Sequence, residues 1–349
     1  MRRLPVFFVI DCSESMVGES IQKVEAGLDQ FIKALRSDPY ALETVYVSVI
    51  AFAGIAKVIS PLIDVISFYP PKLPIGDGTN LGRGLDVLMG ELDSRLIKST
   101  SEQKGDWKPL VYLFTDGRPT EDLKQQLNRW KNSYANKASL IAIGLGGEAD
   151  FEILNQLTND VLILEDQHEN DFKRFIEWVS ASVSARSQSL GIDGKDGALP
   201  EPPPAVQLAK DRNISHVDES CVTLVGRCQK LQKPYLIKYE RVKKVLENTP
   251  FSLDISRYQL SGCYPLNEDY FEWSANSEKF AEVNTDRLDG TPSCPYCGNF
   301  TAFAVCKCGK LLCAGGPGAA VCPWCEEQLN FAAGGGSDQD GFSVTRGKG

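Results

Sequence analysis

The stretch Pro5-Val6-Phe7-Phe8-Val9-Ile10-Asp11-Cys12-Ser13-Glu14-Ser15 decides the fold. Its apolar part has the length of a buried strand, and the chain turns polar at Asp11. Apolar residues then recur at helical spacing over residues 21–35. Strands separated by helices are typical of a doubly wound α/β fold with a mostly parallel sheet. We assign residues 1–190 to this fold, and the further strands predicted in it are 45–52, 110–114, 140–145 and 161–164.

Oxygen donors lie where strands of this sheet end. In a doubly wound sheet, ligands bind beyond the carboxyl ends of the strands. Asp11, Ser13 and Ser15 follow the first strand, Asp116 follows the third, and Thr79 lies in a Gly-rich loop before another predicted helix. Hydroxyl and carboxylate oxygens are the donors that Mg²⁺ and Mn²⁺ prefer. Helix capping is the alternative for the first three residues, but the full set favours a magnesium or manganese site.

This arrangement resembles the von Willebrand factor A domain. The metal-ion-dependent adhesion site of that family has the pattern Asp-x-Ser-x-Ser, then a Thr in a later loop, then an Asp after the fourth strand. The resemblance covers residues 4–190, and it implies that Ser13 and Ser15 contact the ion, as Thr79 does in some members of the family. It implies that Asp11 and Asp116 act directly or through water. Glu14 departs from the family, which usually has Gly there, and adds a negative charge beside the ion.

The composition argues against binding to nucleic acid or to membranes. The formal net charge is −9 and the pI is about 5.0, which disfavours attraction to nucleic acid and to anionic membranes. The N-terminal apolar run stops at Asp11, too early for a signal peptide, and no run approaches the roughly 20 apolar residues of a spanning helix.

Seven of the 11 cysteines lie within residues 294–325, which favours metal ligation in a reducing compartment. We therefore expect a cytoplasmic protein.

The chain divides after the sheet domain. Residues 191–205 are rich in Gly and Pro and predict a linker. Residues 206–288 predict a small β-rich module, with strands at 222–225 and 235–239. Residues 289–330 predict a cysteine-rich, zinc-ribbon-like domain. The Gly-rich segment 331–349 predicts a disordered tail.

Two C-x2-C knuckles, Cys294/Cys297 and Cys322/Cys325, predict a structural zinc site. Our preferred partition places these four thiolates on one ion. The competing arrangement uses two ions and adds Cys306, Cys308 and Cys313, which leaves an eighth ligand to be found. The available residues are His216, Cys221, Cys228 and Cys263, although for each of them a role outside the metal site is favoured.

The domain order resembles the bacterial TerY proteins associated with tellurium resistance. The segment from Phe303 to Gly309 and the knuckle at 322–325 carry this resemblance, which extends to about residue 330. It implies a non-enzymatic adaptor that belongs to a phosphosignalling module. It also implies two protein partners, a metal-dependent serine/threonine phosphatase and a protein kinase.

Two other function classes are weighed against the adaptor. A magnesium-dependent phosphatase of the haloacid dehalogenase type needs a second Asp two residues after its nucleophilic Asp. Ser13 occupies that position and cannot act as the carboxyl would. Nucleic-acid binding through the zinc ribbon is disfavoured because Lys307 and Lys310 are offset by Glu326 and Glu327.

Overall fold

The computed structural model describes residues 2–116, 118–145, 149, 151–164, 171–192, 206–208, 221–242, 257–274, 281–316, 318–331 and 341–347. The chain forms two compact units, Met1–Pro74 with Thr79–His216 and Ile75–Gly78 with Val217–Gly349. In the described part of the chain, no helix is long and apolar enough to cross a membrane.

The first unit contains a seven-stranded sheet with the order β3-β2-β1-β4-β5-β6-β7. Neighbouring strands from β2 to β6 are parallel, and the edge strands β3 and β7 are antiparallel to their neighbours. The mostly parallel α/β fold is therefore confirmed. The strands are β1 (Leu4–Asp11), β2 (Val45–Phe52), β3 (Ala56–Asp64), β4 (Leu110–Thr115), β5 (Ser139–Leu145), β6 (Val161–Leu164) and β7 (Val206–Leu208).

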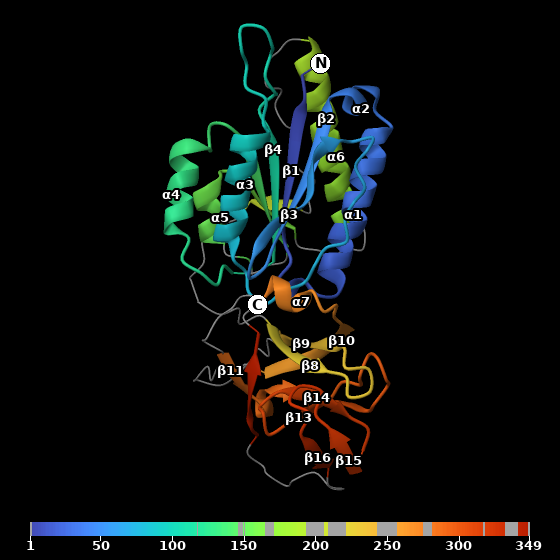
Figure 1. Ribbon diagram of the computed structural model, residues 1–349. Coiled ribbons are helices and arrows are strands. Elements are labelled where there is room, and N and C mark those ends of the chain that lie inside the picture. The colour runs from blue at the N-terminus through green and yellow to red at the C-terminus, as the bar shows by residue number, and fades with distance from the viewer. Residues whose placement is uncertain are drawn as a thin grey trace, which may run out of the picture. The chain divides into compact units, whose positions relative to one another are not determined.

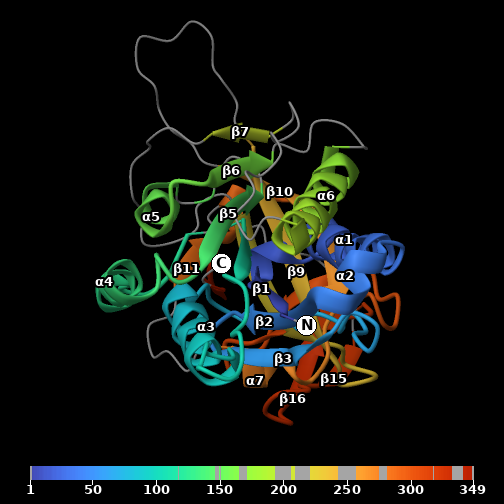
Figure 2. The ribbon, with the colours of Figure 1, turned by 90° about the horizontal axis from the view of Figure 1, so that it is seen from above.

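Helices cover both faces of this sheet, as Figure 2 shows from above. One face carries α1 (Glu19–Arg36), α2 (Pro39–Thr44) and α6 (Asp171–Ile192), and the other carries α3 (Leu81–Arg95), α4 (Lys124–Ser133) and α5 (Phe151–Leu157). A short 3-10 helix, η1 (Glu14–Met16), follows β1.

The central strand β1 supplies both halves of the core. All eight of its residues are buried, and successive side chains point to opposite faces because a strand has a two-residue period. Phe7 and Val9 belong to the apolar cluster with α3 and α4. Phe8 points to the other face and packs edge-on against Phe31 of α1, with ring centroids 5.0 Å apart. The sheet is thus held from both sides, and the end of β1 is fixed.

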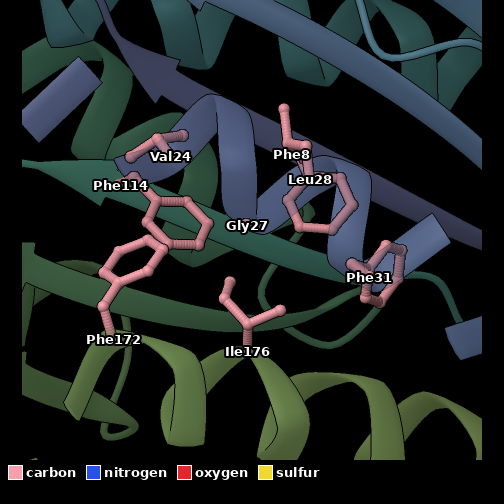
Figure 3. Close-up of a pocket in the computed structure, with 8 residues that line it drawn as sticks. All are labelled: Phe8, Val24, Gly27, Leu28, Phe31, Phe114, Phe172 and Ile176. Carbon is pink, nitrogen blue, oxygen red and sulfur yellow. The ribbon is translucent and has the colours of Figure 1, made fainter. Parts of the chain in front are cut away.

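Helices α1 and α6 approach each other closely at Gly27. A Cβ atom at this position would lie 2.7 Å from Phe172 Cε1 and 2.8 Å from Ile176 Cδ1. Figure 3 shows both side chains of α6 pointing at this part of α1, with Phe8 and Phe114 of the sheet behind them. The missing side chain at Gly27 is therefore what permits the two helices to pack here.

The second unit contains a six-stranded sheet with the order β12-β10-β9-β8-β14-β13. The expected separation between a module at 206–288 and a domain at 289–330 is wrong, because β14 pairs in parallel with β8. Residues 206–208 are also misassigned, since β7 joins the first sheet. The strands are β8 (Cys221–Arg227), β9 (Pro234–Val242), β10 (Arg257–Pro265), β12 (Leu288–Asp289), β13 (Thr301–Val305) and β14 (Leu311–Ala314).

Smaller elements complete the second unit, which Figure 1 draws in yellow to red. They are α7 (Tyr270–Trp273), η2 (Thr285–Arg287), the β15 (Gly318–Val321) and β16 (Gln328–Phe331) hairpin, and the pair β11 (Ala281–Asn284) and β17 (Ser343–Arg346). The expectation of a disordered 331–349 tail is wrong for β17. Val344 and Arg346 are buried, and the Arg346 guanidinium donates to the Cys221 carbonyl at 2.6 Å. The predicted linker lies outside the described residues, except that residues 191 and 192 end α6.

Candidate metal centres

The loop after β1 is held by hydrogen bonds to Asp11. Its Oδ1 accepts the Ser13 N–H at 2.9 Å, and its Oδ2 accepts the Thr115 hydroxyl at 2.6 Å. The carboxylate therefore ties the end of β1 to the end of β4, which pairs with it in parallel. Asp11, Ser13 and Glu14 are fully buried. Because both Asp11 oxygens accept protein hydrogen bonds, the geometry suits an indirect role towards an ion.

Ser13, Ser15 and Asp116 form a connected set. The Ser13 and Ser15 Oγ atoms are 2.9 Å apart, and the Ser15 hydroxyl donates to Asp116 Oδ1 at 2.8 Å. Helix capping does not explain these serines. Neither η1 nor α1 has a side-chain cap bond, and the N-cap of α1 is Gly18. The structure thus brings together hydroxyl and carboxylate oxygens from the ends of two strands.

Thr79 belongs to the same sheet end. Its N–H donates to Thr120 Oγ1 at 3.2 Å, and its carbonyl accepts the Thr120 N–H at 3.0 Å, in the segment that follows β4. The next residue, Asn80, donates its N–H to the Ala53 carbonyl beyond β2 and caps α3 with its side chain. The Thr79 hydroxyl is buried without a hydrogen-bond partner. An unpartnered buried oxygen is costly, and a cation ligated there would remove the cost.

The donors fit a hard divalent cation. Three hydroxyls and two carboxylates lie at one end of the sheet, and oxygen ligands of this kind are those that Mg²⁺ and Mn²⁺ take. Buried carboxylates at Asp11 and Glu14 would also be stabilised by a nearby positive charge. Cys12 between them is fully buried, and desolvation raises the pKa of its thiol well above the ordinary value. This thiol is therefore protonated and packs as an apolar side chain.

The cysteines of the second unit form two groups. The first cluster is Cys228, Cys294, Cys297 and Cys313, and the second cluster is Cys306, Cys308, Cys322 and Cys325. Within each cluster all four sulfurs lie within 4.8 Å of one another. Tetrahedral zinc with bonds near 2.3 Å would hold its sulfurs about 3.8 Å apart. The measured pairs agree, with 3.6 Å for Cys297/Cys313 and 3.9 Å for Cys308/Cys322.

Our preferred zinc partition is therefore wrong in its grouping. Cys294 and Cys297 lie in the first cluster, whereas Cys322 and Cys325 lie in the second. The reason is the hairpin between the knuckles. Its turn places Cys306 and Cys308 with the later knuckle, while β14 carries Cys313 back to the earlier one.

The sequence argument also misplaced Cys228. Register pairs Leu312 with Arg227, so the parallel pairing of β14 with β8 brings Cys313 beside Cys228. Cys228 starts a tight turn in which the Gln232 N–H donates to its carbonyl, the same bond that Gly298 makes to Cys294. The cysteine at the start of a tight turn after β8 was the feature of the sequence that could have identified Cys228 as a ligand. Cys221 and Cys263 lie outside both clusters, and His216 lies outside the described residues.

Two family matches account for most of the chain. Residues 6–175 match the von Willebrand factor type A domain, and residues 218–349 match the TerY-C metal binding domain. The chain has the TerY-type architecture. Its A domain contains the oxygen cluster, and its TerY-C domain contains both cysteine clusters. Comparison with curated proteins gives no significant match.

Solved structures resemble about half of this TerY-type chain. The ArnB paralog VWA2 from Sulfolobus acidocaldarius is 16% identical over 53% of this chain and 45% of its own, with a TM-score of 0.37. The pilus adhesin SpaC of Lactobacillus rhamnosus GG is 14% identical over 53% and 30%, with a TM-score of 0.40. Mussel proximal thread matrix protein 1 with a zinc-occupied MIDAS motif is 17% identical over 51% and 46%, with a TM-score of 0.35. The chain spans less than half the length of each.

Proposed function

We propose that the protein is a non-enzymatic adaptor whose A domain binds a partner through a divalent cation. Asp11, Ser13, Ser15, Thr79 and Asp116 would hold Mg²⁺ or Mn²⁺. A carboxylate of the partner would complete the coordination. The two cysteine clusters of the TerY-C domain would each hold a structural zinc ion.

The buried, unpartnered Thr79 hydroxyl is the observation that best supports the cation site. It lies at the sheet end where the Ser13 and Ser15 hydroxyls meet Asp116. Ligation mainly by neutral hydroxyls leaves a cation much of its charge, which favours an acidic ligand from outside. A cation so placed would attract a partner carboxylate.

The partner identities rest on the TerY resemblance. They are a metal-dependent serine/threonine phosphatase and a protein kinase, in a cytoplasmic phosphosignalling module that responds to tellurium or another stress. The phosphatase alternative for this chain is less well supported. Such an enzyme needs a carboxylic acid two residues after its nucleophilic Asp. Here that position is Ser13, whose hydroxyl forms a hydrogen bond with the Ser15 hydroxyl.

Affinity capture of the tagged chain from its host tests the proposal. With Mg²⁺ in the buffer, the wild-type chain should recover the phosphatase and kinase, and Ser13→Ala should recover neither. Ser94→Ala is the matched control, because Ser94 is an exposed serine of α3 that donates to the Gly90 carbonyl. Equal recovery by Ser13→Ala, or recovery that is independent of magnesium, would contradict the cation bridge.

A further inference from the structure

The two cysteine clusters differ in exposure. In the first cluster three of the four cysteines are buried, and Cys297 is half-buried. In the second cluster Cys308 and Cys325 are exposed. Solvent and small oxidants therefore reach two residues of the second cluster directly.

The surroundings of the clusters differ in the same direction. Among the described positions, Cys228, Cys294 and Cys313 belong to a core of 13 buried residues that includes side chains of the six-stranded sheet. Cys306 and Cys322 share a much smaller core, in which Leu312 is the third buried side chain. Opening the second cluster would thus expose far less apolar surface than opening the first.

Hydrogen bonds also protect the first cluster better. The Gln229 N–H and the Asn299 side-chain amide donate to Cys313 Sγ, and the Leu231 N–H donates to Cys228 Sγ. In the second cluster backbone N–H groups serve the inner sulfurs: the Cys308 N–H donates to Cys306 Sγ and the Trp324 N–H donates to Cys322 Sγ. Over the described residues, the Cys308 sulfur accepts no N–H bond. Donors to a thiolate lower its reactivity, so Cys308 is the least protected sulfur.

We propose that Cys308 is an oxidation site for hydroperoxides and that Cys322 resolves it, so that the second cluster releases zinc while the first retains it. The Cys308 and Cys322 sulfurs are 3.9 Å apart and come from different turns of the chain. Cys308 is exposed, whereas Cys322 is buried. The proposal rests on zinc binding by the second cluster.

The chemistry balances with one hydroperoxide. The Cys308 thiolate attacks the peroxide oxygen, the O–O bond breaks, and the products are the Cys308 sulfenic acid and hydroxide. The Cys322 thiolate then attacks the Cys308 sulfur, the S–O bond breaks, and hydroxide leaves as the disulfide forms. Two thiolates are oxidised by two electrons, and the peroxide is reduced. A zinc ion that loses two of four thiolates dissociates.

The structural result would be local. The β15–β16 hairpin leads into and out of the Cys322/Cys325 knuckle and forms a sheet of only two strands. Trp324 in that knuckle donates its indole N–H to the Leu311 carbonyl, and Arg227 and Lys310 lie over its ring. Zinc loss would expose Trp324 and the cations that lie over its ring, while the six-stranded sheet stays folded.

Titration of the reduced full chain with hydrogen peroxide tests the proposal. Zinc release is followed with a chromogenic chelator, and cysteine states are followed by differential alkylation and peptide mass spectrometry. We expect one of the two zinc ions to leave, together with a Cys308–Cys322 disulfide, and thiol reductant with added zinc should restore the starting state. Simultaneous loss of both ions, or first oxidation in the first cluster, would overturn the proposal.

Two variants sharpen the result. Cys308→His keeps a zinc ligand but removes the oxidisable thiolate, and it should slow peroxide-dependent release by about 10-fold or more. Cys263→Ser changes a cysteine outside both clusters and should leave release unchanged. Wild-type release rates in Cys308→His would refute the role of Cys308. The zinc content before peroxide reports on the proposed zinc sites separately, and the order of cysteine oxidation in the wild type is readable even if a variant fails to fold.

Discussion

Replacing Thr79 by Val tests the cation site, because the variant should be more stable than the wild type without magnesium but should gain less stability when magnesium is added. The side chain is 1% exposed and its hydroxyl has no hydrogen-bond partner. Such an oxygen costs about 1–3 kcal/mol, and Val removes it while keeping the branched shape. Without magnesium the variant should therefore be more stable than the wild type by about 1 kcal/mol, which is about 2–4 °C in Tm for a domain of this size.

With magnesium the effect should change. At a concentration about 100 times Kd, a ligand stabilises the wild type by about 2.7 kcal/mol, or about 5–11 °C. Loss of one ligand should weaken binding at least about 10-fold, which reduces the gain to about 1.4 kcal/mol or less. The magnesium-induced rise in Tm should thus fall to about half or less in Thr79→Val.

The assay is calorimetry of the full chain, zinc-loaded and freed of magnesium by gel filtration, since a chelator would also extract zinc. Thr79→Ser keeps the oxygen and should retain the magnesium response. Thr115→Val loses the bond to Asp11 and should be less stable with or without magnesium. A Thr79→Val protein that is destabilised without magnesium and responds to it like the wild type would refute our reasoning.

Three further predictions concern packing and the cysteines. Gly27→Ala should lower the free energy of unfolding, measured by urea titration, by about 1–3 kcal/mol, because its Cβ would lie 2.8 Å from Ile176 Cδ1. Gly90→Ala is the control. Gly90 is an exposed helical position with nothing within 4 Å of the added Cβ, so this change should raise the free energy of unfolding by about 0.5–1 kcal/mol. Elemental analysis should find two zinc ions per wild-type chain and one in Cys228→Ser; two ions in the variant would exclude Cys228 as a ligand, and a single ion in the wild type would restore the rejected partition. Burial raises the pKa of Cys263 from 9.0 to about 12, so its thiolate at pH 8 should be about 1,000-fold rarer and its alkylation correspondingly slower than in unfolded protein; equal rates would contradict this burial.

The sequence predicted the sheet well and located the candidate oxygen donors just after its strands, because parallel strands end at one edge and polar residues after them are local signals. The five central strands were found within one residue of their bounds at every end. The edge strand β3 was missed. It contains Pro61 and is only partly buried, and an edge strand tolerates both features although they obscure its pattern.

The cysteine partition could not be read in the same way. Spacing finds a knuckle, but it does not say which knuckles face each other. That choice depends on the parallel pairing of β8 with β14, between residues 85 positions apart in the example of Gly226 and Leu311. The buried β17 was hidden for a related reason, since its partner β11 lies far upstream and its flanks are rich in Gly.

The contacts of β17 have a consequence for synthesis. The Arg346 side chain bonds the carbonyl at the start of β8, and the Gly347 N–H bonds the Thr223 carbonyl. A ribosome that has made the A domain has released all of its central strands, which can pair at once. The TerY-C domain cannot complete its fold at that stage, because β8 lacks its contacts with Arg346 and Gly347 until residue 347 has been synthesised.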